Sequence, residues 1–104
     1  MRKEPLEGEL LQDSHVFLHP ERYRIMKLLA EKPMHISELS RAMSEERRLV
    51  TYHLVKLEER GFVKSKYELS EQPKSKGKAI RVYTATDKVA EVKAKLKKGL
   101  EKEL

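Results

Sequence analysis

A cluster of side chains suited to binding an anionic partner occurs in the middle of the chain. Arg47, Arg48, Thr51 and Tyr52 are spaced so that they fall largely on one side of a helix, and Lys56 follows one turn later. Arginine can offer two donors to a guanine edge, while hydroxyls and lysines hold phosphates in register. This face therefore favours a polar, anionic partner. On the residues alone, an ordinary helical hairpin with a solvated charged face is an equal alternative.

This segment is predicted to be the second of two helices within residues 36–62, separated by a tight turn. Apolar residues recur at helical spacing in both, namely Ile36, Leu39, Ala42 and Met43 in the first helix and Val50, Leu54 and Leu57 in the second. His53 lies at the edge of the second stripe, which favours a structural role over a role as a ligand. Gly61 ends the second helix, because only glycine adopts the left-handed conformation cheaply.

The other elements are predicted from periodicity and from the positions of proline and glycine. Helices are expected at 5–13, 20–32 and 87–104, and strands at 34–36, 62–70 and 79–86. Ile25, Leu28 and Leu29 form the buried stripe of the second of these helices. The order of elements predicts an α+β, mainly α fold: a winged helix-turn-helix with a two-stranded β-hairpin wing and a C-terminal dimerisation helix.

Composition limits the class of protein further. The 104 residues suit a single domain, with an N-terminal extension at 1–18, a core at 19–86 and a C-terminal helix at 87–104. The chain has no cysteine, which excludes disulfides and thiolate metal sites. Its N-terminus is too polar for a signal peptide, so we expect a soluble, cytoplasmic protein. The many charged residues and the absence of asparagine are common in heat-adapted proteins.

The net charge of +6 is concentrated in the C-terminal part of the chain. Residues 61–86 carry six basic and two acidic side chains, and residues 87–104 carry six and four, whereas the first sixty residues are balanced. A localised excess of positive charge argues for an anionic partner better than a diffuse one does.

Several segments resemble the small winged-helix transcription regulators of the ArsR/MarR-like group. HPERYRIMKLL is similar to the family's opening helix, ISELSRAM to its second helix, VTYHLVKLEERGFVK to its recognition-helix signature and VYTAT to the strand that leaves the wing. The similarity extends from about His19 to Thr86, and the pieces occur in the family's order and spacing.

The resemblance implies a DNA-binding role for particular residues. Thr51 and Tyr52 match positions that face the major groove, and Arg47 and Arg48 lie at the leading end of a recognition helix at about 46–60. The wing, at 63–86, would lie on the backbone or in the minor groove through Lys74, Lys76, Lys78 and Arg81. The turn departs from the family because Glu45 and Glu46 place two carboxylates near the expected phosphates, unless they pair with Arg47 or Arg48.

The final helix has two interpretations. Its apolar residues, which include Val89, Val92, Leu96 and Leu100, either pack on the chain's own first helix or pair with a second copy. A two-fold dimer would place two recognition helices on successive turns of a duplex, and the family usually dimerises in this way. We therefore expect a homodimer.

The leading hypothesis is a sequence-specific transcription regulator that binds double-stranded DNA, a repressor rather than an enzyme. The sequence has no glycine-rich phosphate loop and no nucleophile with a base at signature spacing, and its four histidines lack metal-ligand spacing. We expect no metal, cofactor or membrane partner, and leave open whether an effector binds. A winged-helix protein-interaction module, which the Glu45–Glu46 pair favours, and a non-specific DNA-binding protein are the alternatives.

Overall fold

The computed structural model describes the backbone of residues 5–103 and the side chains of residues 8–99. The elements are α1 (Pro5–Phe17), α2 (Pro20–Glu31), β1 (Met34–His35), α3 (Ile36–Met43), α4 (Arg47–Glu59), β2 (Val63–Leu69), a 3₁₀ turn (Pro73–Ser75), β3 (Ala79–Ala85) and α5 (Lys88–Glu103). This is the order of a winged helix-turn-helix, so the predicted fold class is confirmed. Within the described residues, no helix is long and apolar enough to span a membrane.

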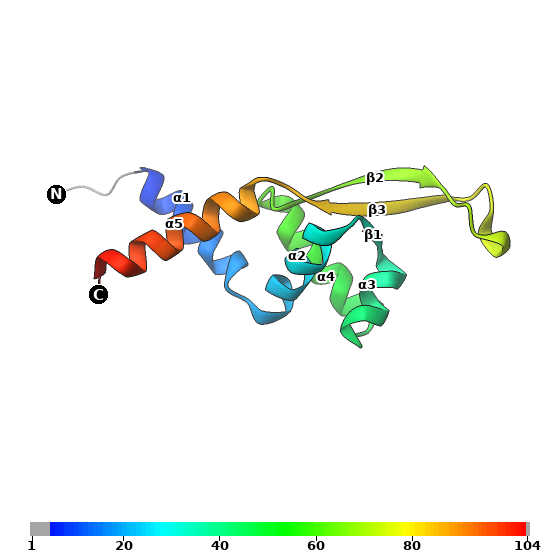
Figure 1. Cartoon of the computed structure of the whole chain (residues 1–104), viewed down its shortest axis with the longest axis horizontal. Coiled ribbons are helices and arrows are strands. Elements are labelled where there is room, and N and C mark those ends of the chain that lie inside the picture. Colours follow the sequence, from blue (N-terminus) through cyan, green and yellow to red (C-terminus); the bar gives the residue numbers. More distant parts are fainter. Residues whose placement is uncertain (1–4, 104) are drawn as a thin grey trace.

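The sheet is built around a long hairpin. The three antiparallel strands have the order β1-β3-β2, and β2 pairs with β3 from Val63↔Ala85 at the base to Leu69↔Ala79 near the tip. The short β1 pairs only with the base of β3, through Met34↔Tyr83 and His35↔Val82. Figure 1 shows the rest of the hairpin extending away from the helices as a wing.

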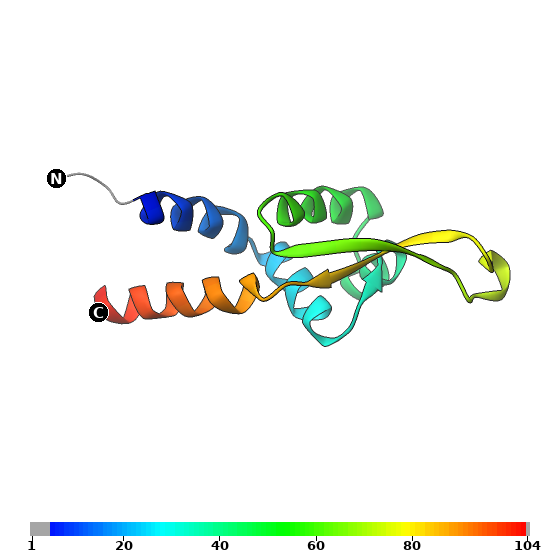
Figure 2. The same ribbon diagram turned by 90° about the horizontal axis from the view of Figure 1, so that it is seen from above.

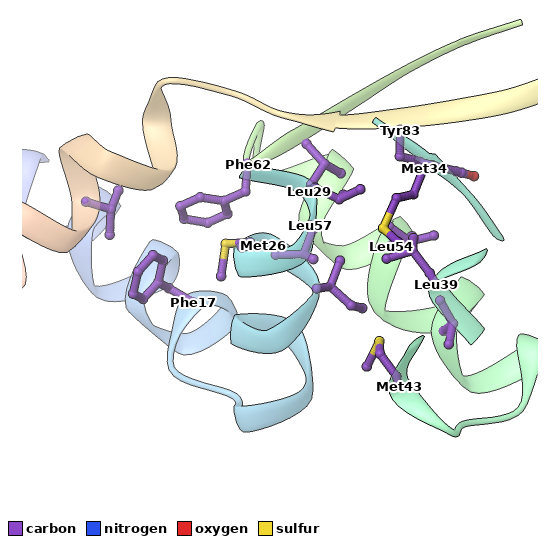
Figure 3. Packing of buried hydrophobic residues seen from close by; sticks show 14 residues of the cluster. Phe17, Met26, Leu29, Met34, Leu39, Met43, Leu54, Leu57, Phe62 and Tyr83 are labelled. Carbon is purple, nitrogen blue, oxygen red and sulfur yellow. The ribbon is translucent and has the colours of Figure 1, made fainter. Parts of the chain in front are cut away.

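The core lies where α2, α3 and α4 meet the base of the sheet (Figure 3). Side chains that are at most 2% exposed are Ile25, Met26, Leu39, Val50, Leu54, Leu57, Phe62 and Val63. The predicted stripes of α2 and α4 are thus confirmed, although Leu28 is only partly buried. The expected burial of Ala42 is wrong, since this side chain is exposed beside the buried Met43.

Helix α1 is longer than predicted and contributes to the core. It runs to Phe17 rather than ending at Asp13, and Phe17 is 3% exposed. The ring of Phe17 lies 5.6 Å from that of Phe62 and 5.9 Å from that of Tyr23, measured between centroids. Helices α1 and α5 contact each other and lie at the end of the molecule that is opposite to the wing (Figures 1 and 2). The molecule is therefore elongated, with extents of 60 × 24 × 22 Å along its principal axes.

Helix termini are fixed by local hydrogen bonds. The His19 ring accepts a bond from the Glu21 amide at the start of α2, and His35 and Glu38 form a capping box at the start of α3. Helix α4 ends at Glu59, and Gly61 follows with φ of +82° while the Phe62 amide bonds back to the Leu57 carbonyl. The predicted role of Gly61 is confirmed.

Two glycine substitutions should change stability in opposite directions. Gly61→Ala leaves steric room but forces a side chain into the left-handed region, so we expect a loss of roughly 1–2 kcal/mol. Gly99→Ala lies inside α5 with open space around its Cβ, so we expect a gain of about 1 kcal/mol. Thermal unfolding of both variants checks this. An unchanged or raised melting temperature for Gly61→Ala would contradict the assignment of the helix end.

Candidate nucleic-acid interface

The outer face of α4 is uncovered. Arg47, Arg48, Thr51 and Tyr52 are all exposed, while Val50, His53, Leu54 and Leu57 on the inner face are at most 4% exposed. Lys56 is half-buried, with its ammonium 5.6 Å from the centroid of the Tyr52 ring. In Figure 2, α4 runs along one edge of the molecule. The structure therefore brings together the five side chains predicted to bind DNA from this helix.

The turn between α3 and α4 is held by backbone bonds rather than by its carboxylates. Ser44 adopts a left-handed conformation with φ of 55°, and the Glu45 amide bonds to the Ser40 carbonyl at 3.1 Å. The Arg47 guanidinium bonds to the Ser37 hydroxyl at the start of α3. Among the side chains that the structure describes, no ion pair joins Glu45 or Glu46 to Arg47 or Arg48. The two carboxylates of the turn are therefore not neutralised by these arginines.

A buried polar contact holds the inner side of α4 to α2. The Nε of Arg22 donates to the Nδ1 of His53 at 3.1 Å, and both side chains are at most 9% exposed. Burial lowers the pKa of His53, and the neighbouring His19 and Arg22 lower it further. The Arg22 guanidinium also lies 5.9 Å from the centroid of the Tyr52 ring. His53 is thus a neutral acceptor inside the domain, as its structural interpretation predicts.

The tip of the wing is an ordered loop that carries three exposed lysines. Ser70 is 3% exposed, its amide bonds to the Lys78 carbonyl at 2.8 Å, and its hydroxyl lies 2.7 Å from that of Ser75. Lys74, Lys76 and Lys78 project from this loop. Arg81 is different: it lies lower on β3 and binds Glu58 of α4. The predicted wing set is therefore split between the tip loop and a position within β3, opposite Tyr67.

The residues predicted for a dimer interface differ in exposure. Val92 is 3% exposed within its own chain, whereas Val89 and Leu96 are partly buried against the core. The side chain of Leu100 lies outside the described residues.

Sequence reasoning missed an ion network that joins three helices. Asp13 of α1 is 6% exposed, accepts a hydrogen bond from Arg60 Nε at 2.9 Å and forms an ion pair with Lys88 Nζ at 3.0 Å. The bond to Asp13 raises the pKa of Arg60. Asp13 lies at the predicted end of the first helix among other acidic residues, so no local pattern could have indicated this contact.

Comparison with known proteins supports the resemblance. Residues 19–65 match the family model described as "Bacterial regulatory protein, arsR family". No curated protein matches the chain significantly in sequence.

Solved structures extend the likeness to most of the chain. An ArsR-like transcriptional regulator from Rhodococcus sp. RHA1 is 20% identical with a TM-score of 0.70, over 96% of this chain and 86% of that one. NolR from Sinorhizobium fredii is 18% identical with a TM-score of 0.70, over 94% of both chains. HlyU from Vibrio cholerae is 17% identical with a TM-score of 0.68, over 88% and 92%. At these identities the neighbours establish the fold, and the family match supports a DNA-binding transcription regulator.

The buried His53 should make stability depend on pH. Its folded pKa lies below the unfolded value of about 6.5, so stability is full above that pH and is lost as pH falls toward the folded pKa. We expect wild type to lose more melting temperature between about pH 7 and pH 5 than His53→Gln does. The variant His15→Gln, at an exposed position on α1, serves as control. Equal losses in wild type and His53→Gln would contradict a neutral buried histidine.

Proposed function

We propose that this ArsR-like winged helix-turn-helix protein is a homodimeric, sequence-specific repressor that places α4 in the major groove of double-stranded DNA. The outer face of α4 carries the proposal. Its inner side is buried in the core, and its outer side presents Arg47, Arg48, Thr51 and Tyr52 to solvent. Such groups can pair with guanine edges and hold phosphates, which are the contacts that a recognition helix makes.

The wing supplies a second, less specific contact in this proposal. Lys74, Lys76 and Lys78 gather on one loop at the end of the hairpin, far from α4 along the strands (Figure 1). Ammonium groups neutralise phosphates and release counterions regardless of sequence. The wing therefore adds affinity, while α4 adds the preference for particular bases.

The arm formed by α1 and α5 is the proposed dimer contact. Leu11 and Leu18 are 65% and 67% exposed, and Val89 and Leu96 of α5 retain part of their surface. A two-fold axis through this arm would present two α4 helices to one palindromic site. A dimer on a promoter would exclude polymerase, which is how it would repress.

The recognition assignment predicts a loss of base preference on mutation. Replacing both Arg48 and Tyr52 by alanine should remove contacts worth about 1–3 kcal/mol each and reduce discrimination between cognate and scrambled duplexes at least about tenfold. Fluorescence anisotropy of labelled duplexes measures this, with Arg24→Ala on the exposed side of α2 as control. Full discrimination in the double variant would overturn the assignment of α4.

The dimer assignment predicts a change in mass. Leu11→Glu should place a charge in the contact and shift the protein from two chains toward one chain of 12.2 kDa. Light scattering after size exclusion measures the mass. Leu69→Glu is the matched control, because Leu69 on the wing is 67% exposed and Leu11 is 65% exposed. If both variants stay at the wild-type mass, α1 is not in an interface.

A protein-interaction module is the second candidate, and one observation favours it. Leu49, Tyr52 and Val55 on the outer face of α4 are 39%, 50% and 48% exposed, which is more apolar surface than phosphate binding needs. The exposed Glu46 at the start of α4 also opposes an anionic partner. A stoichiometric protein partner together with no duplex binding at low salt would favour this function over the repressor.

A further inference from the structure

Three side chains form a closed hydrogen-bonded triangle between the recognition helix and the wing. Arg81 of β3 donates from Nε to the Ser65 hydroxyl at 2.9 Å and from a terminal nitrogen to Glu58 Oε1 at 3.0 Å. Ser65 of β2 in turn donates to Glu58 Oε2 at 2.9 Å. Both carboxylate oxygens of Glu58 are therefore engaged, one by each strand of the hairpin.

The triangle lies where the wing leaves the body of the protein. On the inner face of the hairpin, Val63 and Tyr83 are buried, and the Arg81 guanidinium lies 5.3 Å from the centroid of the Tyr83 ring. Beyond this point the side chains of β2 are all exposed from Lys66 to Leu69. The other edge of the hairpin base is fixed by β1, which pairs only with Val82 and Tyr83 of β3.

A two-stranded ribbon that projects into solvent needs support at its base, because an isolated hairpin is marginally stable at best. The β1 pairing holds the β3 edge, and the triangle is a hydrogen-bonded connection from both strands of the hairpin to α4, beside the packing of Val63 and Tyr83 in the core. A contact at this place can set the direction of the wing relative to α4. The wing and α4 can then contact one duplex without the hairpin having to become ordered first.

We propose that Arg81 and Glu58 are positioning residues that hold the wing at a fixed angle to α4, and that Arg81 does not itself bind DNA. This inference rests on the proposed DNA-binding function. It removes Arg81 from the set of DNA-contacting residues that was predicted from the sequence. The Glu58 carboxylate already pairs with the arginine at 3.0 Å, so its charge is committed to a partner in the same chain rather than to a phosphate.

Replacing Glu58 distinguishes a positioning role from a purely electrostatic effect, because the two predict opposite changes in the affinity for DNA. Glu58→Met removes a negative charge, which by electrostatics alone tightens binding to DNA. Loss of the triangle should instead weaken binding to the cognate duplex about tenfold, as disruption of a coupled network does. Glu59→Met is the matched control, since Glu59 is the next residue on α4, is exposed and lies outside the triangle. It should bind as tightly as wild type or more tightly.

The double variant tests whether the two residues act as one unit. Arg81→Met should weaken cognate binding about as much as Glu58→Met, and the Glu58→Met/Arg81→Met protein should be no weaker than either single variant. An exposed ion pair contributes little to stability, so all of these variants are expected to fold, and circular dichroism checks this.

Two outcomes would overturn the proposal. One is tighter binding of Glu58→Met, as in the Glu59→Met control. The other is a loss of DNA affinity in Arg81→Met that adds to the loss in Glu58→Met, together with a slope of log K against log[salt] that is shallower by about 0.9. Such a change in slope is expected when one phosphate contact is lost.

A measurement without DNA distinguishes failure of the triangle from failure of the DNA-binding function. The chain has no cysteine, so Val55→Cys on α4 and Lys76→Cys at the wing tip give two unique sites for spin labels. The proposal predicts a narrow distance distribution in this protein and a broad one when Arg81→Met is added. Equal widths would refute the positioning role even if wild type binds DNA. If Arg81→Met broadens the distance distribution but the unlabelled wild-type protein binds no duplex, the DNA-binding function is rejected and the positioning role of the triangle still stands.

Discussion

Burial of one side of α4 is the constraint on which the rest of the structure depends. Val50, Leu54 and Leu57 are at most 1% exposed, and burying each contributes roughly 1.5–3 kcal/mol. Since successive residues of a helix are about 100° apart, rotating α4 by one position would bury a charged or polar side chain in their place. The orientation of Arg48 and Tyr52 toward solvent is therefore a consequence of the core.

Polar contacts extend this fixed orientation to the rest of the molecule. Arg22 holds the middle of α4 through the buried His53. At the C-terminal end of the helix, Arg60 binds the buried Asp13, which joins α4 to α1 and, through Lys88, to α5. A dimer contact on α1 and α5 would thus be connected to α4 by ion pairs within each chain, and the spacing of two recognition helices would depend on them.

Periodicity predicted most of the fold, because the buried stripes of α2 and α4 are local properties of the sequence. It failed where the outcome depends on distant packing. The period that places Ile36 and Leu39 toward the core also includes Ala42, but only the arrangement of neighbouring elements shows that Ala42 is left exposed. Phe17 follows the predicted end of α1, and its burial depends on Phe62. The choice of Glu58 as the partner of Arg81 requires the hairpin to be folded, whereas the resemblance to winged-helix regulators grouped this arginine with the wing-tip lysines.

Binding of duplex DNA by the unmodified chain decides whether α4 recognises a base sequence. Fluorescence anisotropy would compare the DNA upstream of its own coding region with a scrambled duplex across a series of salt concentrations. We expect the native duplex to bind about 10³-fold tighter or more, with a dependence of affinity on salt concentration that shows several released counterions. Equal affinity for both duplexes would contradict sequence-specific recognition by α4, and no binding even at low salt would contradict a DNA-binding function altogether.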